Sequence, residues 1–90
     1  MTEFFETVPF EMATDIEQLS RLTYELRESR KTILQFHDVT DEAALLQKIR
    51  TGTLAEHPAY EHYLSARILA DTRETARVAL TDVLKVANKI

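Results

Sequence analysis

The chain of 90 residues contains no cysteine, no tryptophan, a single glycine and two prolines. Without cysteine it has no disulfide framework, no thiolate metal ligand and no thiol nucleophile, and this usage fits a reducing cytoplasm. With one glycine it has no glycine-rich loop to cradle a phosphate and little means of building an oxyanion hole. We therefore expect a protein that is not an enzyme and that carries no cofactor.

Long apolar runs are also missing. No segment approaches the roughly 20 residues that a membrane-spanning helix needs, and acidic residues stand near the N-terminus where a signal peptide has basic ones. The net charge of −4 is unevenly placed, because residues 1–20 hold five acids and no base. No segment has the large basic excess that is typical of nucleic-acid binding. The sequence thus predicts a cytoplasmic protein that binds neither membrane nor nucleic acid.

One small basic group follows, consisting of Arg27, Arg30 and Lys31. These bases fall on one side of a helix, where they could contact a phosphate backbone. Glu25 and Glu28 stand among them, and no aromatic residues are interleaved with them. A solvated helix surface is therefore the preferred interpretation.

The scarcity of helix breakers and the lack of strand-like alternation after the first ten residues favour an all-α fold. Thr14 and Glu17 have the spacing of a capping box, Thr40 is a good N-cap, and Pro58 suits the first position of a helix. Gly52 supplies the left-handed residue that commonly follows a helix. We expect helices at about 14–37, 41–50 and 58–88.

Both long helices carry apolar stripes. In the first, the stripe alternates steps of three and four, which is the seam of a coiled coil or a bundle; it comprises Leu19, Leu22, Leu26, Ser29, Ile33 and Phe36. In the third, at about 100° per residue, it comprises Ile68, Leu69, Ala76, Ala79, Leu80, Val83, Val86 and Ala87. Ser29 is either a tolerated polar residue in the seam or a position that sets its register.

Three apolar residues depart from the stripe of the third helix. Tyr60, Tyr63 and Leu64 point about 140° away from its centre, and one antiparallel neighbour covers only one of these directions. We therefore expect residues 14–90 to form an antiparallel helical hairpin with a short connecting helix, which pairs with a second copy as a dimeric four-helix bundle. A monomeric three-helix bundle is the alternative.

Residues 1–13 form an acidic and apolar N-terminal arm. Its phenylalanines are Phe4, Phe5 and Phe10, and Pro9 argues against a helix there. We expect the arm either to fold back over the bundle or to dock on another protein. Because exposed apolar clusters often mark contact surfaces, we predict a non-enzymatic protein–protein interaction module, acting as an adaptor, accessory subunit or regulator. Its predicted contact residues are Tyr60, Tyr63, Leu64, Phe4, Phe5 and Phe10.

A metal-binding helical bundle is the alternative function. His57 and Glu61 are four residues apart, so on a helix they share a face. The third candidate ligand is His37, or else Asp38, at the end of the first helix. His62 lies about 140° around the helix from His57 and is not expected to join it. The Glu-x-x-His spacing of di-iron bundles is absent from the sequence.

Overall fold

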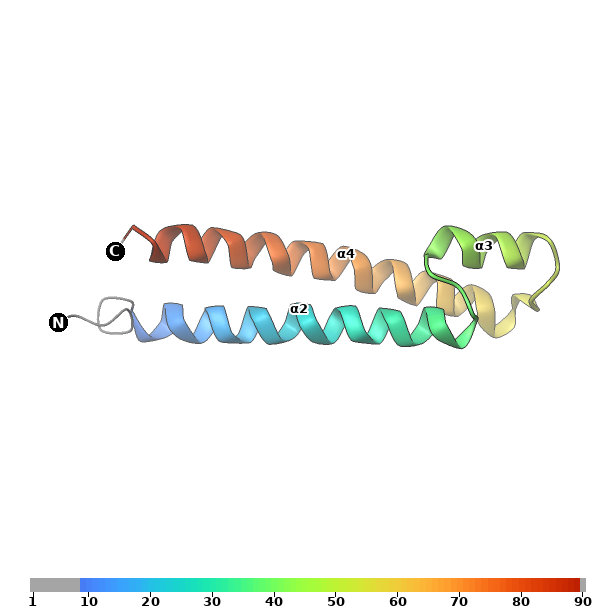
Figure 1. The fold of residues 1–90 in the computed structure, drawn as a ribbon, viewed down its shortest axis with the longest axis horizontal. Coiled ribbons are helices and arrows are strands. Elements are labelled where there is room, and N and C mark those ends of the chain that lie inside the picture. Colours follow the sequence, from blue (N-terminus) through green and yellow to red (C-terminus); the bar gives the residue numbers. More distant parts are fainter. Residues whose placement is uncertain (1–8, 90) are drawn as a thin grey trace.

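The structure is a computed structural model that describes residues 9–89, and this part of the chain is helical with no strand. Helix α2 spans Phe10–Phe36, α3 spans Glu42–Arg50 and α4 spans Glu56–Ala87. Helices α2 and α4 lie side by side and run in opposite directions, and α3 lies beside the first turns of α4 (Figure 1). The molecule measures 63 × 16 × 16 Å. The predicted all-α class is confirmed, and we call the pair α2 and α4 the stem.

Helix α2 begins earlier than the sequence predicted. Pro9 is the N-cap, and its carbonyl oxygen accepts the backbone N–H of Ala13 at 3.0 Å. Its missing N–H costs nothing, because an N–H at the start of a helix has no partner within the helix. Thr14 lies inside the helix, and the predicted capping box is therefore wrong. Residues 10–13, assigned to the arm by the prediction, belong to α2. Phe10 is 71% exposed at its first position, while Phe4 and Phe5 lie outside the described residues.

The segment between α2 and α4 also differs in detail from the sequence prediction. The N-cap of α3 is Asp41 rather than Thr40, because its Oδ1 atom accepts the backbone N–H of Ala44 at 2.8 Å. Gly52 follows α3 with a left-handed φ of 77°, which glycine adopts without a steric penalty. His57 has extended backbone angles within α4 (φ −103°, ψ 130°). The uninterrupted part of α4 therefore starts at Pro58.

The seam of the stem follows a seven-residue repeat on both helices. On α2 its buried or half-buried positions are Met12, Ile16, Leu19, Thr23, Leu26, Arg30, Ile33 and His37. On α4 they are Ala59, His62, Ala66, Leu69, Arg73, Ala76, Leu80, Val83 and Ala87. Alternating steps of three and four are typical of antiparallel helices that pack along their whole length. Half of the predicted α2 seam is wrong, because Leu22, Ser29 and Phe36 are exposed.

The prediction for α4 also needs correction. Tyr63 lies at the edge of the seam and packs against the core cluster, whereas Ile68 and Val86 are 64% and 49% exposed. A straight helical wheel drifts by about 20° per heptad relative to a seven-residue seam, which is about 80° over four heptads. This drift contributes to the apparent departure of Tyr63 from the predicted stripe, whereas the seam continues along α4 through Arg73.

The best-packed part of the molecule is the turn end, where α3 covers the stem. Leu45 of α3 is fully buried, and it packs in one cluster with Leu34 and Ala66. Arg30 joins α2 to α3, since its Nε and Nη2 atoms donate to Glu42 at 2.5 and 2.6 Å. Within residues 9–89, the buried apolar side chains are two leucines and four alanines. Helices α2, α3 and α4 each lack either the length or the apolar character of a membrane-spanning segment.

Candidate functional site

One long side of the stem is bordered by two lines of residues with seven-residue spacing. The α2 line comprises Asp15, Leu22, Ser29 and Phe36, and the α4 line comprises Pro58, Ser65, Thr72, Ala79 and Val86. Phe36 and Pro58 line one hollow, and Asp15 and Val86 line another. The two lines therefore lie on the same long side of the stem, with one hollow near each end of it.

The large apolar residues on this side define what we call the apolar face. Leu22, Phe36 and Val86 belong to the two lines, and Ile68 lies next to them, three residues after Ser65. Their exposed fractions are 40% for Leu22, 73% for Phe36, 64% for Ile68 and 49% for Val86. Four partly or largely exposed apolar side chains on one side of a small protein are typical of a contact surface.

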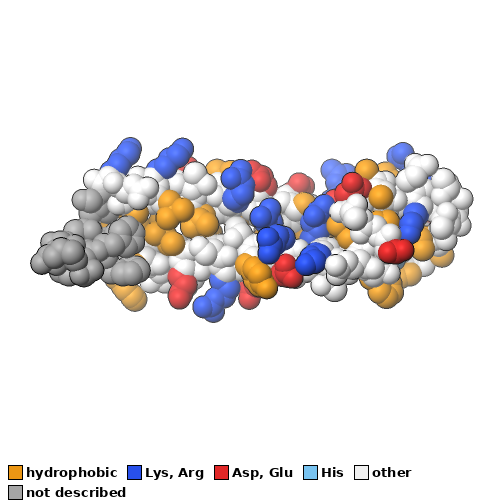
Figure 2. Space-filling model, in the orientation of Figure 1, with side chains coloured by type: hydrophobic (Ala, Val, Ile, Leu, Met, Phe, Trp, Pro, Cys, Tyr) orange, Lys and Arg blue, Asp and Glu red, His pale blue; other side chains and the backbone are white. Residues whose placement is uncertain are grey.

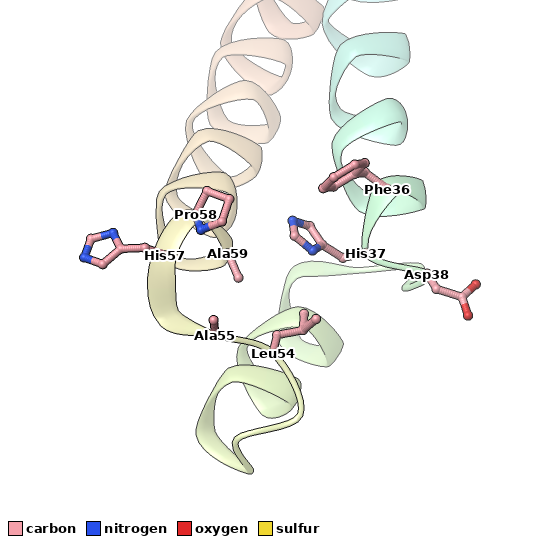
Figure 3. Close-up of a pocket in the computed structure, with 8 residues that line it drawn as sticks. All are labelled: Phe36, His37, Asp38, Leu54, Ala55, His57, Pro58 and Ala59. Carbon is pink, nitrogen blue, oxygen red and sulfur yellow. The ribbon is translucent and has the colours of Figure 1, made fainter.

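The hollow at the turn end measures about 410 Å³. Its walls are mostly apolar and come from the end of α2, the loop after α3 and the start of α4; they comprise Phe36, His37, Asp38, Leu54, Ala55, His57, Pro58 and Ala59. Figure 3 shows the Phe36 and His37 rings on one side, facing Pro58 and Ala59. The side chains of Asp38 and His57 point outward. His37 is thus the polar side chain that faces this hollow.

The hollow at the opposite end of the apolar face measures about 370 Å³. It is lined by Pro9, Glu11, Met12, Asp15, Asp82, Val83 and Val86. Met12 and Val83 are half-buried seam residues, while Glu11, Asp15 and Asp82 are exposed. This hollow therefore combines an apolar floor with an acidic rim.

Two histidines join the ends of the long helices beside the turn-end hollow. The Nε2 atom of His37 lies 2.8 Å from the Nδ1 atom of His62, and His37 is 7% exposed. Burial lowers the pKa of His37 below its ordinary value, and the nearby His62 and Lys48 lower it further. Lys48 of α3 also donates to the carbonyl oxygen of His37 at 2.9 Å. The hydrogen bond between the two imidazoles ties the end of α2 to the early turns of α4.

The structure does not bring the three predicted metal ligands His57, Glu61 and His37 together. The exposed His57 has its Nδ1 atom 2.8 Å from Glu61, which raises the pKa of His57, and it points away from the hollow. His37 faces His62 instead. No group of three or more metal-ligating side chains is found within residues 9–89. The sequence placed His57 and His62 on different faces but did not indicate that His62 faces the seam.

The predicted tyrosine surface is divided by the structure. Tyr60 and Leu64 are 41% and 40% exposed and lie one turn apart on α4. Tyr63 is half-buried, and its ring stacks on that of Tyr60 with centroids 5.9 Å apart. Tyr60 and Leu64 are therefore available to a partner, whereas Tyr63 belongs in part to the core.

The two long sides of the stem differ in charge. Heptad positions beside the apolar face carry Glu11, Asp15, Glu25, Glu61 and Asp82. Seam and flanking positions toward the other side carry Arg27, Arg30, Lys31, Arg67, Arg73 and Arg77. Figure 2 shows Lys and Arg side chains gathered near the middle of one face of the molecule. The sequence did not indicate this, because antiparallel pairing brings together bases that are about 40 residues apart.

Fold and site together define a class, a narrow all-helical protein with one long apolar side. Residues 13–88 match the family model described as Uncharacterized protein MJ0235 family. Because this match covers most of the chain, the protein belongs to that family. No curated protein and no solved structure matches the chain.

Proposed function

We propose that the protein is a non-enzymatic helical interaction module that pairs with a second copy through the apolar face. Two antiparallel hairpins joined in this way form a four-helix bundle. In this arrangement the module acts as an adaptor, accessory subunit or regulator, with Tyr60 and Leu64 on the outer surface of α4 left for a further protein.

The main support is the position of the apolar stripes. Six residues of the sequence stripes lie outside the seam, and all of them except Ile68, which lies next to them, belong to the two lines on one long side of the stem; they are Leu22, Ser29 and Phe36 on α2 and Ile68, Ala79 and Val86 on α4. Each helix thus carries more apolar surface on this long side than it needs for packing against the other helix of the stem. The small buried core within residues 9–89 adds to this argument, since short chains gain much of their stability from association.

Light scattering or sedimentation at micromolar concentration tests the pairing. We expect a species of twice the 10.4 kDa chain mass. Leu22→Glu with Ile68→Glu places two charges on the apolar face and should give the monomer with unchanged helicity by circular dichroism. Val78→Glu is the matched control, because Val78 is 46% exposed and lies outside the apolar face. A wild-type monomer at these concentrations contradicts the proposed pairing.

The adaptor role needs a separate test. Tyr60→Ala with Leu64→Ala should abolish capture of the partner by the tagged protein in extracts of its own host, while the dimer persists. Tyr63 is left unchanged, because its packing against Leu34, Leu45 and Ala66 makes it part of the core. Equal capture by the variant and the wild type contradicts a role for this surface.

A further inference from the structure

A small hollow lies between α2 and α4 on the basic side of the stem, away from the apolar face. It measures about 180 Å³ and is lined by Thr23, Tyr24, Arg27 and Arg73. Each of these four side chains has a hydrogen-bond donor, and none is an acid. The Thr23 hydroxyl already donates to the carbonyl oxygen of Ser20 at 2.9 Å. Tyr24, Arg27 and Arg73 are therefore the donors left for a ligand.

Arg73 is the unusual residue of this group. It occupies a seam position, where its Nε atom is buried and has no hydrogen-bond partner within the described part of the chain. No carboxylate among residues 9–89 forms a salt bridge with it. A hydrogen bond from Arg77 lowers the pKa of the adjacent Glu74, and the charge of Arg73 lowers this pKa further, but Glu74 forms its salt bridge with Arg77. A partly buried guanidinium with an unsatisfied donor is costly, and an apolar residue at this position of a helical seam would pack better.

The neighbouring arginines differ from Arg73 in how they are paired with carboxylates. Arg30 is held by Glu42, and Arg77 donates to both oxygens of Glu74 at 3.0 and 2.6 Å. Arg27 has only a 3.4 Å contact with Glu28 and keeps 56% of its side chain exposed. Its guanidinium lies 5.6 Å from the centre of the Tyr24 ring, a cation–π contact that orients the group. Aromatic support, which seemed absent from the sequence around this basic group, is therefore present.

We propose that this hollow binds the phosphate group of a small molecule. Guanidinium groups present planar pairs of N–H donors that match phosphate oxygens, and two arginines from different helices line this hollow. An oxyanion would form the salt bridge that Arg73 lacks within the described residues, and the phenol of Tyr24 adds a third donor. The volume of the hollow suits one phosphate group. Glu28 and Glu74 lie next to the lining arginines in the sequence, and their negative charges would repel further phosphates bound along the stem.

Titration of the full chain with inorganic phosphate, against chloride at constant ionic strength, tests the proposal. We expect saturable changes in the nuclear magnetic resonance signals of the Tyr24 and Arg27 backbone amides and of the Arg73 Nε–H group. Arg73→Leu should weaken phosphate binding by at least about tenfold, since it removes one charged donor group. The same variant should keep or raise the melting temperature, because leucine suits a seam position.

Two variants keep the test decisive. Arg77→Gln is the matched control, since this base lies on the same side but is occupied by Glu74, and phosphate affinity should stay within about twofold of the wild type. Arg27→Gln changes a largely exposed side chain and should weaken binding without affecting the fold, even if Arg73→Leu does not fold. No saturable change with phosphate overturns the proposal, as does an equal loss in the Arg77 control. Tighter binding of a single-stranded oligonucleotide than of phosphate also overturns it, because the partner is then nucleic acid.

Discussion

The Nε2 atom of His37 lies 2.8 Å from the Nδ1 atom of His62, so the residue that ends α2 is hydrogen-bonded to the early turns of α4. The Phe36 ring stands nearly perpendicular to both imidazoles, with centroids 5.0 Å from His37 and 5.9 Å from His62. The pair can share one proton, whereas two protonated rings at this distance repel each other. Acid should therefore loosen the turn end first.

We predict that the stability of the protein falls as the pH is lowered through the range in which histidine titrates. Burial keeps the pKa of His37 in the folded chain below its ordinary value, so the unfolded chain binds more protons there. The contribution of His37 is full above the unfolded pKa of about 6.5 and is lost as the pH falls through the folded pKa. Thermal unfolding followed by circular dichroism between pH 7.5 and 5.5 measures this loss.

Substitution of His37 tests whether this residue causes the pH dependence of stability. His37→Gln should lower stability at pH 7.5 but flatten its dependence on pH. His57→Gln is the control, because Glu61 raises the pKa of His57, whose contribution is present at low pH and lost as the pH rises. If His37→Gln leaves the wild-type profile intact, the imidazole pair is not the origin of the acid sensitivity.

We predict that the ion pair between Arg30 and Glu42 holds α3 on the stem. The side chains are 30% and 17% exposed, and the contact is bidentate. Glu42→Gln should cost roughly 1–2 kcal/mol, because it leaves a partly buried guanidinium with a weaker acceptor. Glu74→Gln should cost much less, since its pair with Arg77 is exposed to solvent. Chemical denaturation of both variants measures the difference, and equal costs would contradict a special role for the Arg30 pair.

We predict that the seam of the stem does not tolerate larger residues in place of its buried alanines. Ala66 has no exposed surface, so Ala66→Leu should force α2 and α4 apart at a cost of about 1–3 kcal/mol. Ala43→Leu is the matched control, because Ala43 is exposed on α3. Thermal unfolding compares the two variants, and a melting temperature that is unchanged for Ala66→Leu would show that the helices are not closely packed there.

We predict that self-association strengthens with salt. The apolar face is flanked by Asp15, Glu25, Glu61 and Asp82, so two copies that meet through it bring like charges together. Raising the salt concentration from about 0.02 to about 0.5 M shortens the Debye length from about 20 to about 4 Å and so screens their repulsion. Sedimentation over this range measures the effect, and Asp82→Asn should tighten association at low salt only. Weaker association with salt would instead indicate that the apolar face meets the basic side of another copy.

The sequence was sufficient for the helices but not for their relative rotation. The lack of helix breakers predicted three helices, and Pro58 marked the start of the uninterrupted part of α4. The seam was harder to predict, because its inward positions include Thr23, Arg30 and Arg73, which a search for apolar residues passes over. Leu22 and Phe36 were assigned to the seam for the opposite reason, since they are apolar but exposed.

The candidate site depended on contacts between segments that are far apart in the chain. His37 and His62 are 25 residues apart, and nothing local indicates that they form a hydrogen bond. Tyr63 packs against the core cluster that includes Leu45 of α3, so its burial depends on the position of α3, which lies beside α4. Helix periodicity predicts which residues share a face, but the neighbour that covers this face is set by tertiary packing.

The acidic and basic sides described above give the stem a charge asymmetry across its short axis. An elongated body with this asymmetry is turned by the electric field of an approaching charged surface, so that one long side leads at contact. At physiological ionic strength the Debye length is about 8 Å, which is about half of the 16 Å thickness of the molecule. Each long side therefore responds to a charged surface nearly independently of the charges on the other side.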